Sequence, residues 1–407
     1  MTDKPQFVGK KVRLGDIVKI EKASMPSGNN VWVLNLDTVE KGTGKVIVKN
    51  RMKADSAGTS TVAFTADAVL YSKLRPNLNK VVVADEPGLA TSEMLPLIVN
   101  PEVLDRRYFA YLLRSNSFVN LAVSSTAGSK MPRMNKKTLL NAVFPIPSLE
   151  LQHQRIDLLS SIEKARTKAE LLIQQLDTLV KSRFIEMFGD PVEENRWARI
   201  TLASLCTKLG SGATPRGGKA AYKTSGIPLI RSMNVHNGYF ESKDLAYIDE
   251  IQAKKLDNVT LHKGDVLLNI TGASVARSCL LPDYLAGGRV NQHVSIVRCD
   301  PNRMLPRVLN SIFTSDSYQR FLLEHSRMAG ATREAITKDD LETMTVPLPP
   351  LSLQYKFAAF VAQADKSRFI DLRNESSKLL LQLNRRQRHT ETAKCLLVDF
   401  RHLRTAR

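Results

Sequence analysis

The chain lacks the residue patterns that indicate secretion, membrane insertion or metal binding. Its four cysteines, Cys206, Cys279, Cys299 and Cys395, are widely spaced and include no Cys-x-x-Cys pair. We therefore expect free or buried thiols, and neither a disulfide framework nor a zinc site. No apolar run approaches the length of a membrane span, and residues 1–5 lack the apolar core of a signal peptide. These absences predict a cytoplasmic protein.

Motifs for phosphate binding and catalysis are also missing. The glycines at 210–212 and 42–44 lack the spacing of a nucleotide-binding phosphate loop, and Pro215 would disturb a dinucleotide-type helix start. There is no Asn/Asp-Pro-Pro-Tyr sequence, no glycine-rich S-adenosylmethionine loop, no carboxylate cluster typical of a nuclease and no metal-ligand spacing among the seven histidines. The sequence therefore predicts a chain with no catalytic residues, cofactor or metal of its own.

Two long segments almost lack the residues that break helices. Residues 148–190 contain no proline and one glycine at their end, and residues 351–407 contain neither residue. Each segment follows a Pro-x-Pro sequence that leads into Leu-x-Leu-Gln, first at Pro145–Gln152 and then at Pro347–Gln354, an ungapped offset of 347 − 145 = 202 residues. The sequence therefore predicts two tandem halves, each a globular region followed by a long helix.

Within each half, predicted strands precede predicted helices. In the first half we expect strands at 12–20, 31–36, 45–49, 68–71 and 80–84 and helices at 108–121 and 138–141. In the second half we expect a short helix or strand at 201–209, strands within 264–273 and 289–297, and a helix at 307–324. This order fits an α+β fold better than a doubly wound α/β fold.

Each long helix carries apolar residues at alternating spacings of three and four, which is typical of a coiled coil. The apolar positions are Leu159, Ile162, Ala169, Ile173, Leu176 and Val180 in the first helix, and Phe369, Leu372, Leu379 and Leu383 in the second. About forty residues span roughly 60 Å, and an exposed stripe of that length needs a partner. We therefore expect antiparallel pairing of the two helices with a pseudo-twofold relation between the halves. Packing of each helix on its own globular region alone is the alternative.

The charge balance predicts a polyanionic partner. The formal net charge is +19 and the pI is about 9.8, so DNA or RNA is the first candidate and a ribosome-associated protein is an alternative. Arg, Asn and Gln match base edges, and Lys supplies charge to phosphates. Such side chains lie in loops near predicted strands: Lys73, Arg75, Asn77, Asn79, Lys130, Arg133, Arg216, Lys219, Arg231, Asn234, Asn269, Arg277, Asn291, Gln292 and Arg333. Taken singly, each could also be a solvated surface residue or a local cap.

Further motifs add to the doubled proline sequence. They are Phe184–Pro191 followed by Trp197, Gly212–Pro215 with Gly226–Ile230, Gly264–Leu268 with Thr271–Ala273, and Val290–Val294. In this order they resemble the specificity subunits of type I restriction-modification systems, and the resemblance covers the whole chain. Two departures are visible: leucine stands at 151 and 353, where the family commonly has glutamate, and the first half has no Gly-x-Thr-Pro sequence.

The resemblance implies target-recognition domains at 1–147 and 191–349, a central spacer helix at 148–190 and a distal spacer helix at 350–407. Each domain would read one half of a split site in double-stranded DNA. Two modification subunits would bring S-adenosylmethionine and methylate adenine, and restriction subunits would use ATP and Mg. A coiled-coil adaptor that binds protein instead of DNA, and an enzyme with an unrecognised cofactor site, are the alternatives from other functional classes.

Overall fold

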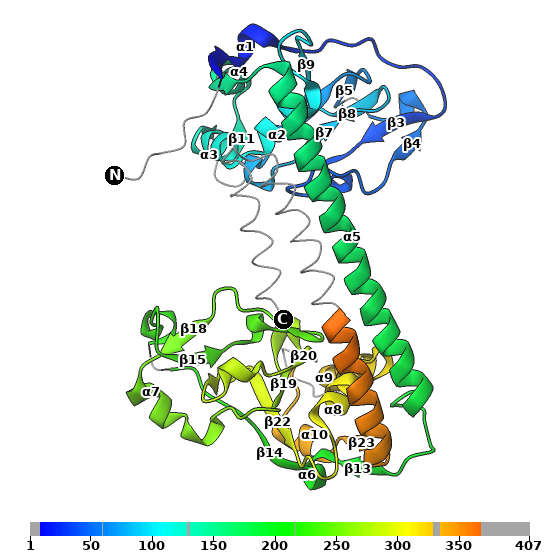
Figure 1. The fold of residues 1–407 in the computed structure, drawn as a ribbon, viewed down its shortest axis with the longest axis vertical. Coiled ribbons are helices and arrows are strands. Elements are labelled where there is room, and N and C mark those ends of the chain that lie inside the picture. Colours follow the sequence, from blue (N-terminus) through cyan, green and yellow to red (C-terminus); the bar gives the residue numbers. More distant parts are fainter. Residues whose placement is uncertain (1–8, 59, 128–130, 216, 329–333, 368–407) are drawn as a thin grey trace. The chain divides into compact units, whose positions relative to one another are not determined.

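The computed structural model describes residues 9–58, 60–127, 131–215, 217–328 and 334–367 (Figure 1). The chain divides into two compact units, residues 1–164 (unit 1) and 165–407 (unit 2), and the division falls inside helix α5 (Leu149–Phe188). The long helix predicted within residues 148–190 is confirmed. It ends where Gly189 adopts a φ of 78°, a left-handed conformation that glycine favours after a helix C-terminus. No helix of the described segments is long and apolar enough to cross a membrane.

Unit 1 is built around two four-stranded sheets. One has the order β2 (Val18–Ile20), β9 (Met94–Val99), β6 (Val69–Ser72) and β7 (Val81–Val83). The other has the order β4 (Asn50–Met52), β3 (Val31–Leu34), β8 (Gly88–Thr91) and β5 (Thr61–Phe64), with β3 and β8 parallel. Two short antiparallel pairs join β1 (Lys10–Arg13) to β12 (Val143–Ile146) and β10 (Thr126–Ala127) to β11 (Arg133–Met134).

The first sheet of unit 1 is buried on both faces. On one face Val69 and Leu97 pack with Phe109 and Phe118 of helices α2 (Arg106–Arg114) and α3 (Asn116–Ser124). On the other face Leu70 packs in a cluster with residues of the second sheet. This double burial explains why β6 reads as a continuous apolar run. The short helices α1 (Leu14–Ile17) and α4 (Lys136–Asn141) complete the unit.

Unit 2 repeats this topology. Its four-stranded sheet has the order β14 (Cys206–Ser211), β22 (Val294–Cys299), β19 (Val266–Asn269) and β20 (Ser278–Leu280), and helices α8 (Pro306–Thr314), α9 (Asp316–Met328) and α10 (Lys338–Thr343) pack against it. Its second sheet has the order β18 (Ala246–Ile248), β15 (Ile227–Ile230) and β21 (Arg289–Val290), and the β15–β21 pair is parallel like β3–β8.

The shorter elements of unit 2 follow the same plan. Strand β13 (Arg199–Thr201) pairs with β23 (Thr345–Pro347) as β1 pairs with β12, and β16 (Val235–His236) pairs with β17 (Tyr239–Phe240). Two short helices are α6 (Leu202–Leu205) and α7 (Glu250–Lys255). The predicted α+β fold and internal repeat are confirmed.

A buried glutamine connects the start of each long helix to its unit. The Gln152 side chain is 0% exposed, accepts the Asp105 N–H at 2.8 Å and donates to the carbonyls of Val103 and Pro147, both at 2.8 Å. Each of its polar atoms is therefore satisfied, as burial of a primary amide requires.

The second copy of the motif reproduces this arrangement in unit 2. The Gln354 side chain, also 0% exposed, accepts the Leu305 N–H at 2.8 Å and donates to the carbonyls of Arg303 at 3.0 Å and Pro349 at 2.8 Å. The repeated Leu-x-Leu-Gln sequence is therefore a structural device that fixes the base of each long helix.

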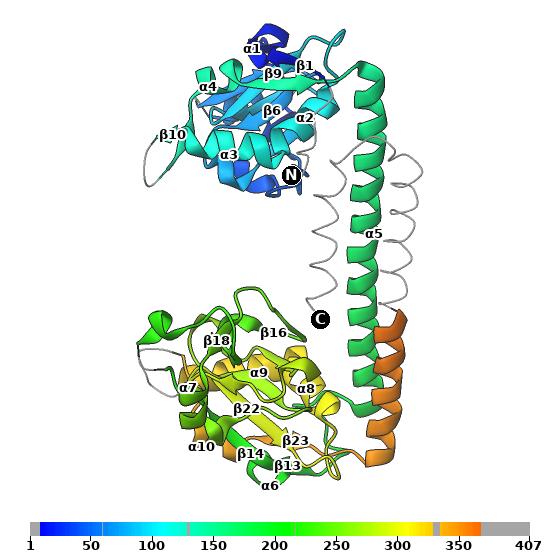
Figure 2. The ribbon, with the colours of Figure 1, turned by 60° about the vertical axis from the view of Figure 1, so that its left-hand side comes forward.

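The last turns of α5 pack antiparallel against the helix at 351–367 within unit 2 (Figure 2). The Phe188 and Phe184 rings lie 5.4 Å and 5.6 Å from the Phe357 ring, and the Arg183 guanidinium lies 5.8 Å from the Phe360 ring. These contacts descend along one helix while they ascend along the other, so the described parts of the two helices pack antiparallel, as predicted.

The predicted packing residues of the long helices have different environments. Ile162 and Ala169 are buried, Val180 packs against the core of unit 2, and Leu159, Ile173 and Leu176 are half-buried. Phe369, Leu372, Leu379 and Leu383 lie outside the described residues.

Five predicted elements differ from the structure. The strand predicted at 12–20 is interrupted by helix α1, and the helix predicted at 307–324 is two helices, α8 and α9, separated at Ser315, whose side chain accepts the Tyr318 N–H. The helix predicted at 108–121 is two helices, because the Ser115 side chain accepts the Phe118 N–H and caps α3. The strand predicted at 45–49 is wrong: Val46 forms one isolated bridge with Val39, and β4 begins only at residue 50. The strand predicted at 289–297 is interrupted, because the Asn291 side chain accepts the His293 N–H and turns the backbone.

Candidate nucleic-acid interface

In unit 1 the structure brings together two candidate stretches that are distant in the sequence, the loop 73–79 and the segment 131–134. Leu74 forms a β-bridge with Arg133, and the Arg75 N–H donates to the Pro132 carbonyl at 2.8 Å. The Met134 N–H donates to the Lys73 carbonyl at 2.9 Å. The candidate cations of unit 1 therefore share one surface.

Within this surface, Arg75 and Asn77 are exposed and Lys73 is half-buried. Asn79, at a left-handed φ of 51°, donates its amide to the Arg114 carbonyl at 2.9 Å, which holds this side chain against the unit. Lys130 lies outside the described residues. Arg75 and Asn77 are thus the side chains of this loop that are free to reach a partner.

Arg133 is held by an acidic neighbour. Its Nε and Nη2 atoms lie 3.0 Å and 2.9 Å from Oε1 of Glu93, and these hydrogen bonds raise the pKa of the arginine. The Arg133 side chain is 45% exposed, and exposed pairs of this kind contribute little free energy. The guanidinium can therefore exchange this carboxylate for another anion at low cost.

In unit 2 the loops that follow β14, β19 and β21 converge. The Gly212 N–H donates to the Asn291 carbonyl at 3.2 Å, and the Thr214 N–H donates to Oε1 of Gln292 at 3.4 Å. Oγ1 of Thr271 lies 2.6 Å from Nδ1 of His293. The exposed Gln292 therefore lies in a polar cluster with Thr214, Thr271 and His293, three residues of the sequence motifs that were not among the predicted contact residues.

Three candidate amides of unit 2 are buried and serve the fold. The Asn234 amide, 0% exposed, donates to the Glu241 carbonyl at 2.9 Å. The Asn269 amide, also 0% exposed, donates to the Ser232 carbonyl at 2.9 Å. Asn291 is 5% exposed. These side chains are not free to read bases in this structure, which gives them a different role from the predicted one.

The remaining candidates of unit 2 are scattered. The Arg231 guanidinium lies 5.2 Å from the Tyr222 ring and donates to the Asp244 carbonyl. Arg277 is half-buried, and Lys219 lies on a short 3-10 helix, Gly218–Ala221. The side chain of Lys219 and residues Arg216 and Arg333 lie outside the described part of the chain.

The positive charge is concentrated in two segments. Residues 106–149 contain seven Lys or Arg and no Asp or Glu, and residues 195–240 also contain seven cations and no acid. The first segment includes Arg133, and the second includes the loop of Thr214. Acid-free runs of this length are visible in the sequence alone. The second run would have identified Lys208, which lies inside it, as a further candidate for contact with an anion. Among the described residues, no three His, Cys, Asp or Glu side chains form a potential metal site.

Comparison with known proteins finds a family model that matches a range containing the first of these segments. Residues 9–176 match the family model described as the type I restriction modification DNA specificity domain. Residues 9–176 are therefore similar to the DNA specificity domain of this family. The matched range includes the loop 73–79 and Arg133, so the candidate surface of unit 1 lies within the matched segment.

Curated relatives carry the same description over different lengths of the chain. The specificity subunit of the type I restriction enzyme MjaVIII from Methanocaldococcus jannaschii is 21% identical over 387 residues, 87% of this chain and 85% of the relative. The EcoDI specificity subunit of Escherichia coli is 27% identical over 142 residues, and the EcoBI subunit is 20% identical over 317 residues. These two alignments cover 31% and 64% of the relatives.

Solved structures show the same fold. The type I restriction-modification S subunit from M. genitalium aligns with a TM-score of 0.56 at 14% identity, covering 94% of this chain and 96% of the other. A chain from a study of complex assembly and conformational transition of the type I system aligns with a TM-score of 0.50 at 18% identity and the same coverage. The predicted resemblance to type I specificity subunits is confirmed.

Proposed function

We propose that this chain is the DNA-specificity subunit of a type I restriction-modification complex and reads a bipartite site, one half with each unit. The observation that carries the proposal is the duplication: unit 1 matches the family model of a DNA specificity domain, and unit 2 repeats its sheet topology with different polar loops. Two copies of one framework with different contact residues are what two unlike half-sites require.

Base contacts are assigned to the exposed polar side chains of the converging loops. In unit 1 these are Arg75, Asn77 and Arg133, and in unit 2 the corresponding residue is Gln292. Arginine pairs with guanine and Asn or Gln with adenine in the major groove, each through two hydrogen bonds. Arg133 would give up its exposed ion pair with Glu93 when it contacts DNA.

The long helices would set the distance between half-sites. The 40 residues of α5 correspond to about 60 Å, compared with about 34 to 36 Å for one turn of duplex DNA. The buried glutamines and the contact between Phe188 and Phe357 support this role, because they fix a helix end rigidly to its unit.

The chemistry is assigned to partner subunits. Two modification subunits would supply S-adenosylmethionine and methylate adenine, and restriction subunits would use ATP and Mg in a cytoplasmic complex. This chain would direct both reactions without catalytic residues of its own. The missing cofactor and nucleotide motifs of the sequence support this division of labour.

Methylome sequencing tests the proposal directly. Cells that carry this chain together with its modification subunit should methylate adenine within one bipartite motif that is absent from cells carrying the modification subunit alone. An unchanged methylome would overturn the proposal.

A domain exchange tests whether the two units read independently. Replacement of residues 195–345 by the corresponding segment of a related subunit should change one half of the methylated motif and leave the other half and the spacer unchanged. A change in both halves would contradict independent reading. The reciprocal replacement in unit 1 is the matched control, and it should change only the other half.

A further inference from the structure

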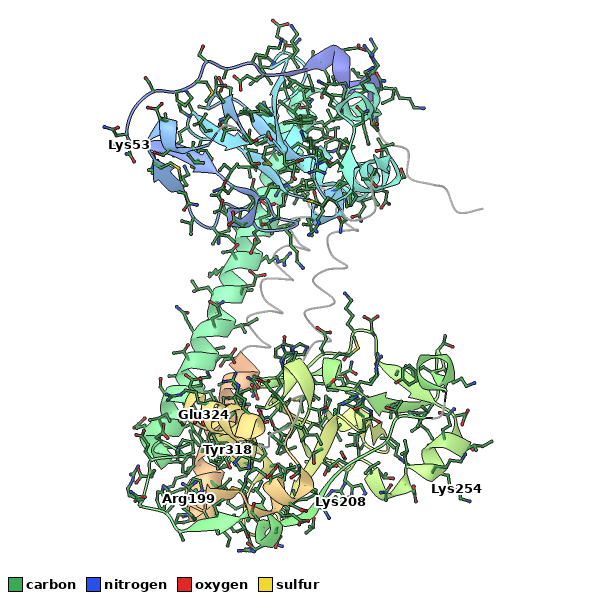
Figure 3. The ribbon with its side chains drawn as sticks, turned by 180° about the vertical axis from the view of Figure 1, so that it is seen from behind. Lys53, Arg199, Lys208, Lys254, Tyr318 and Glu324 are labelled. Carbon is green, nitrogen blue, oxygen red and sulfur yellow. The ribbon has the colours of Figure 1, made fainter. Side chains whose placement is uncertain are left out.

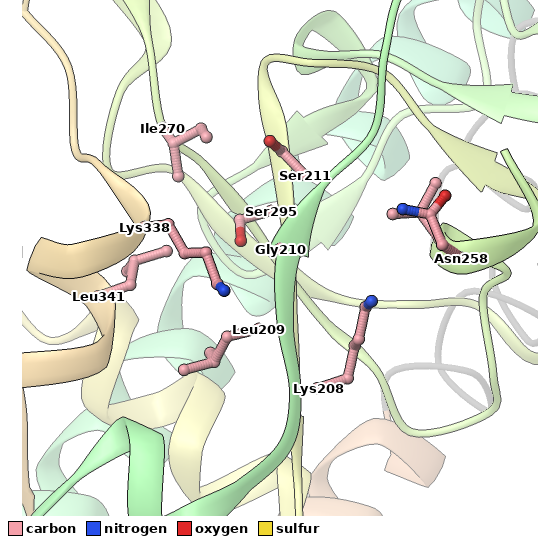
Figure 4. Close-up of a pocket in the computed structure, with 10 residues that line it drawn as sticks. Lys208, Leu209, Gly210, Ser211, Asn258, Ile270, Ser295, Lys338 and Leu341 are labelled. Atoms are coloured by element: carbon pink, nitrogen blue, oxygen red, sulfur yellow. The ribbon is translucent and has the colours of Figure 1, made fainter.

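Unit 2 has a cavity of about 280 Å³ at the edge strand β14, called here the β14 cavity (Figure 4). Its polar lining comes from Lys208 and Ser211 of β14, Asn258, Ser295 of β22 and Lys338 of α10. Figure 4 shows Lys208 on one side of β14 and Lys338 with Ser295 on the other.

The charge of the β14 cavity is positive. The lining residues include two lysines and no carboxylate. The Lys338 side chain is 63% exposed, so the cavity opens to solvent, and its ion pair with Glu342 at 3.1 Å joins exposed neighbours on one helix turn. Such pairs are weak and exchange readily. Within the described segments, the Lys208 ammonium has no carboxylate partner. An anion at the edge of β14 would therefore lie between two cations, Lys208 on one face of the sheet and Lys338 on the other.

Ser295 gives this cavity a second, independent feature. Ser295 is 1% exposed, and its Oγ is buried with no hydrogen-bond partner among the described residues. The strand register places Ser295 opposite Ser211 and Leu268, on the sheet face that packs against α10. Buried hydroxyls nearly always have a partner. An acceptor inside the cavity would satisfy this donor.

The combination specifies the chemical class of the ligand. Two ammonium groups and a hydroxyl donor suit a phosphate group, whose several oxygens can accept all of them. A backbone phosphate of DNA contributes position and affinity but no sequence information. We propose that the β14 cavity binds one DNA backbone phosphate in the half-site of unit 2, with Lys208, Lys338 and Ser295 as its ligands. This inference rests on the proposed function.

Unit 1 lacks an equivalent cavity lining. Lys338 corresponds to Lys136 at the offset of 202 residues. Leu209 pairs with Val297 in unit 2 as Ile20 pairs with Leu97 in unit 1, so the two sheets can be aligned at these pairs. Ser295 then corresponds to Leu95, which is 8% exposed and part of the apolar core. Unit 1 therefore keeps a lysine at this place but not the hydroxyl, and the phosphate site belongs to unit 2 alone.

The test measures DNA binding by the complex with its modification subunits over a salt series. The double variant Lys208→Gln/Lys338→Gln should flatten the slope of log affinity against log salt by about 0.9, the value for one lost phosphate contact. The loss should be the same for cognate and non-cognate DNA. Lys254→Gln is the control, because Lys254 is exposed on α7 and lies away from Lys208 (Figure 3).

Ser295→Ala separates ligand binding from folding. Removal of an unsatisfied buried hydroxyl should leave the thermal midpoint of the free chain unchanged or raise it, whereas binding of DNA should weaken severalfold. Ethylation interference should identify one phosphate in the unit 2 half-site that matters to the parent complex and not to Ser295→Ala. A lower midpoint with unchanged DNA binding would assign Ser295 a purely structural role and overturn the inference.

The remaining outcomes are distinguishable. If the parent complex binds DNA and the lysine variants behave like Lys254→Gln, the phosphate site is wrong and the proposed function stands. If the parent complex binds no DNA, both fail. If inorganic phosphate at constant ionic strength stabilises the parent chain but not Ser295→Ala, while the DNA salt slopes are equal, the cavity is a site for free phosphate and the DNA assignment is overturned.

Discussion

Unit 1 and unit 2 share their sheet order but differ in the residues that their loops present. The shared parts are buried and hydrogen-bonded: Gln152 and Gln354 make the same three hydrogen bonds at the base of a helix. The different parts are polar loops, with Arg133 and its partner Glu93 in unit 1 and the cluster around Gln292 in unit 2. The comparison indicates that the framework fixes geometry while the loops can change their contacts.

The two glutamines provide the strongest test of the shared framework. Gln152→Ala and Gln354→Ala should each lower the free energy of unfolding of their own unit by about 3 kcal/mol, because buried N–H and C=O groups lose their partners at about 1 to 3 kcal/mol each. Denaturant unfolding of each unit can be followed by its own tryptophan, Trp32 in a Trp197→Phe background and Trp197 in a Trp32→Phe background.

The controls are exposed glutamines on the same helices, Gln154→Ala and Gln363→Ala, which should change stability by less than about 0.5 kcal/mol. A loss confined to one of the two units would show that only one copy of the motif stabilises its helix base. The framework would then be less symmetric than the hydrogen bonds indicate.

Alkaline pH should distinguish the units, because residues 1–164 contain no cysteine. Burial raises the pKa of Cys279 in unit 2 from about 9 to about 12. A raised folded pKa stabilises the fold below the unfolded pKa, and this stability is lost as the pH rises from about 9 towards 12. Ionisation of Cys279 in the unfolded chain should therefore destabilise unit 2 by on the order of 1 kcal/mol at pH 10.

Cys206 and Cys299 act in the same direction, since burial also raises each pKa to about 12. The measurement is the free energy of unfolding of unit 2 between pH 8 and pH 10. Cys279→Ala is the control, and its free energy of unfolding should fall less over this range, by the contribution of one thiol. Equal pH slopes in the parent and in Cys279→Ala would refute the assignment.

The sequence predicted the repeated framework because its signals are local. Absence of proline and the terminal Gly189 define α5, and the offset of 202 residues aligns Gln152 with Gln354. The strand at 45–49 was predicted wrongly for a reason that lies elsewhere in the chain: the Lys49 ammonium is bound by Asp85 at 2.7 Å and Glu86 at 2.9 Å, and Ile47 is left 61% exposed.

The candidate site was harder to predict. An amide that reads a base and an amide that holds a loop look the same in a sequence, and the Ser232 carbonyl that accepts from Asn269 lies 37 positions away. Ser295 carried no signal at all, because an unpartnered hydroxyl exists only once β22 and α10 are packed. The acid-free run at 195–240 was the available clue to Lys208.

The smallest expected difference concerns one buried tyrosine in each unit. The Tyr318 hydroxyl donates to the Thr345 carbonyl at 3.1 Å, and the Tyr71 hydroxyl lies 3.8 Å from Sδ of Met134, a weak acceptor. Tyr318→Phe should cost unit 2 about 1 kcal/mol, the typical net value of one hydrogen bond, and Tyr71→Phe should cost unit 1 less. Arg199 continues to donate to Thr345 at 3.1 Å, which limits the first loss. Denaturant midpoints read by Trp197 and Trp32 decide the comparison, and a larger loss in unit 1 would show that the thioether contact stabilises more than its geometry indicates.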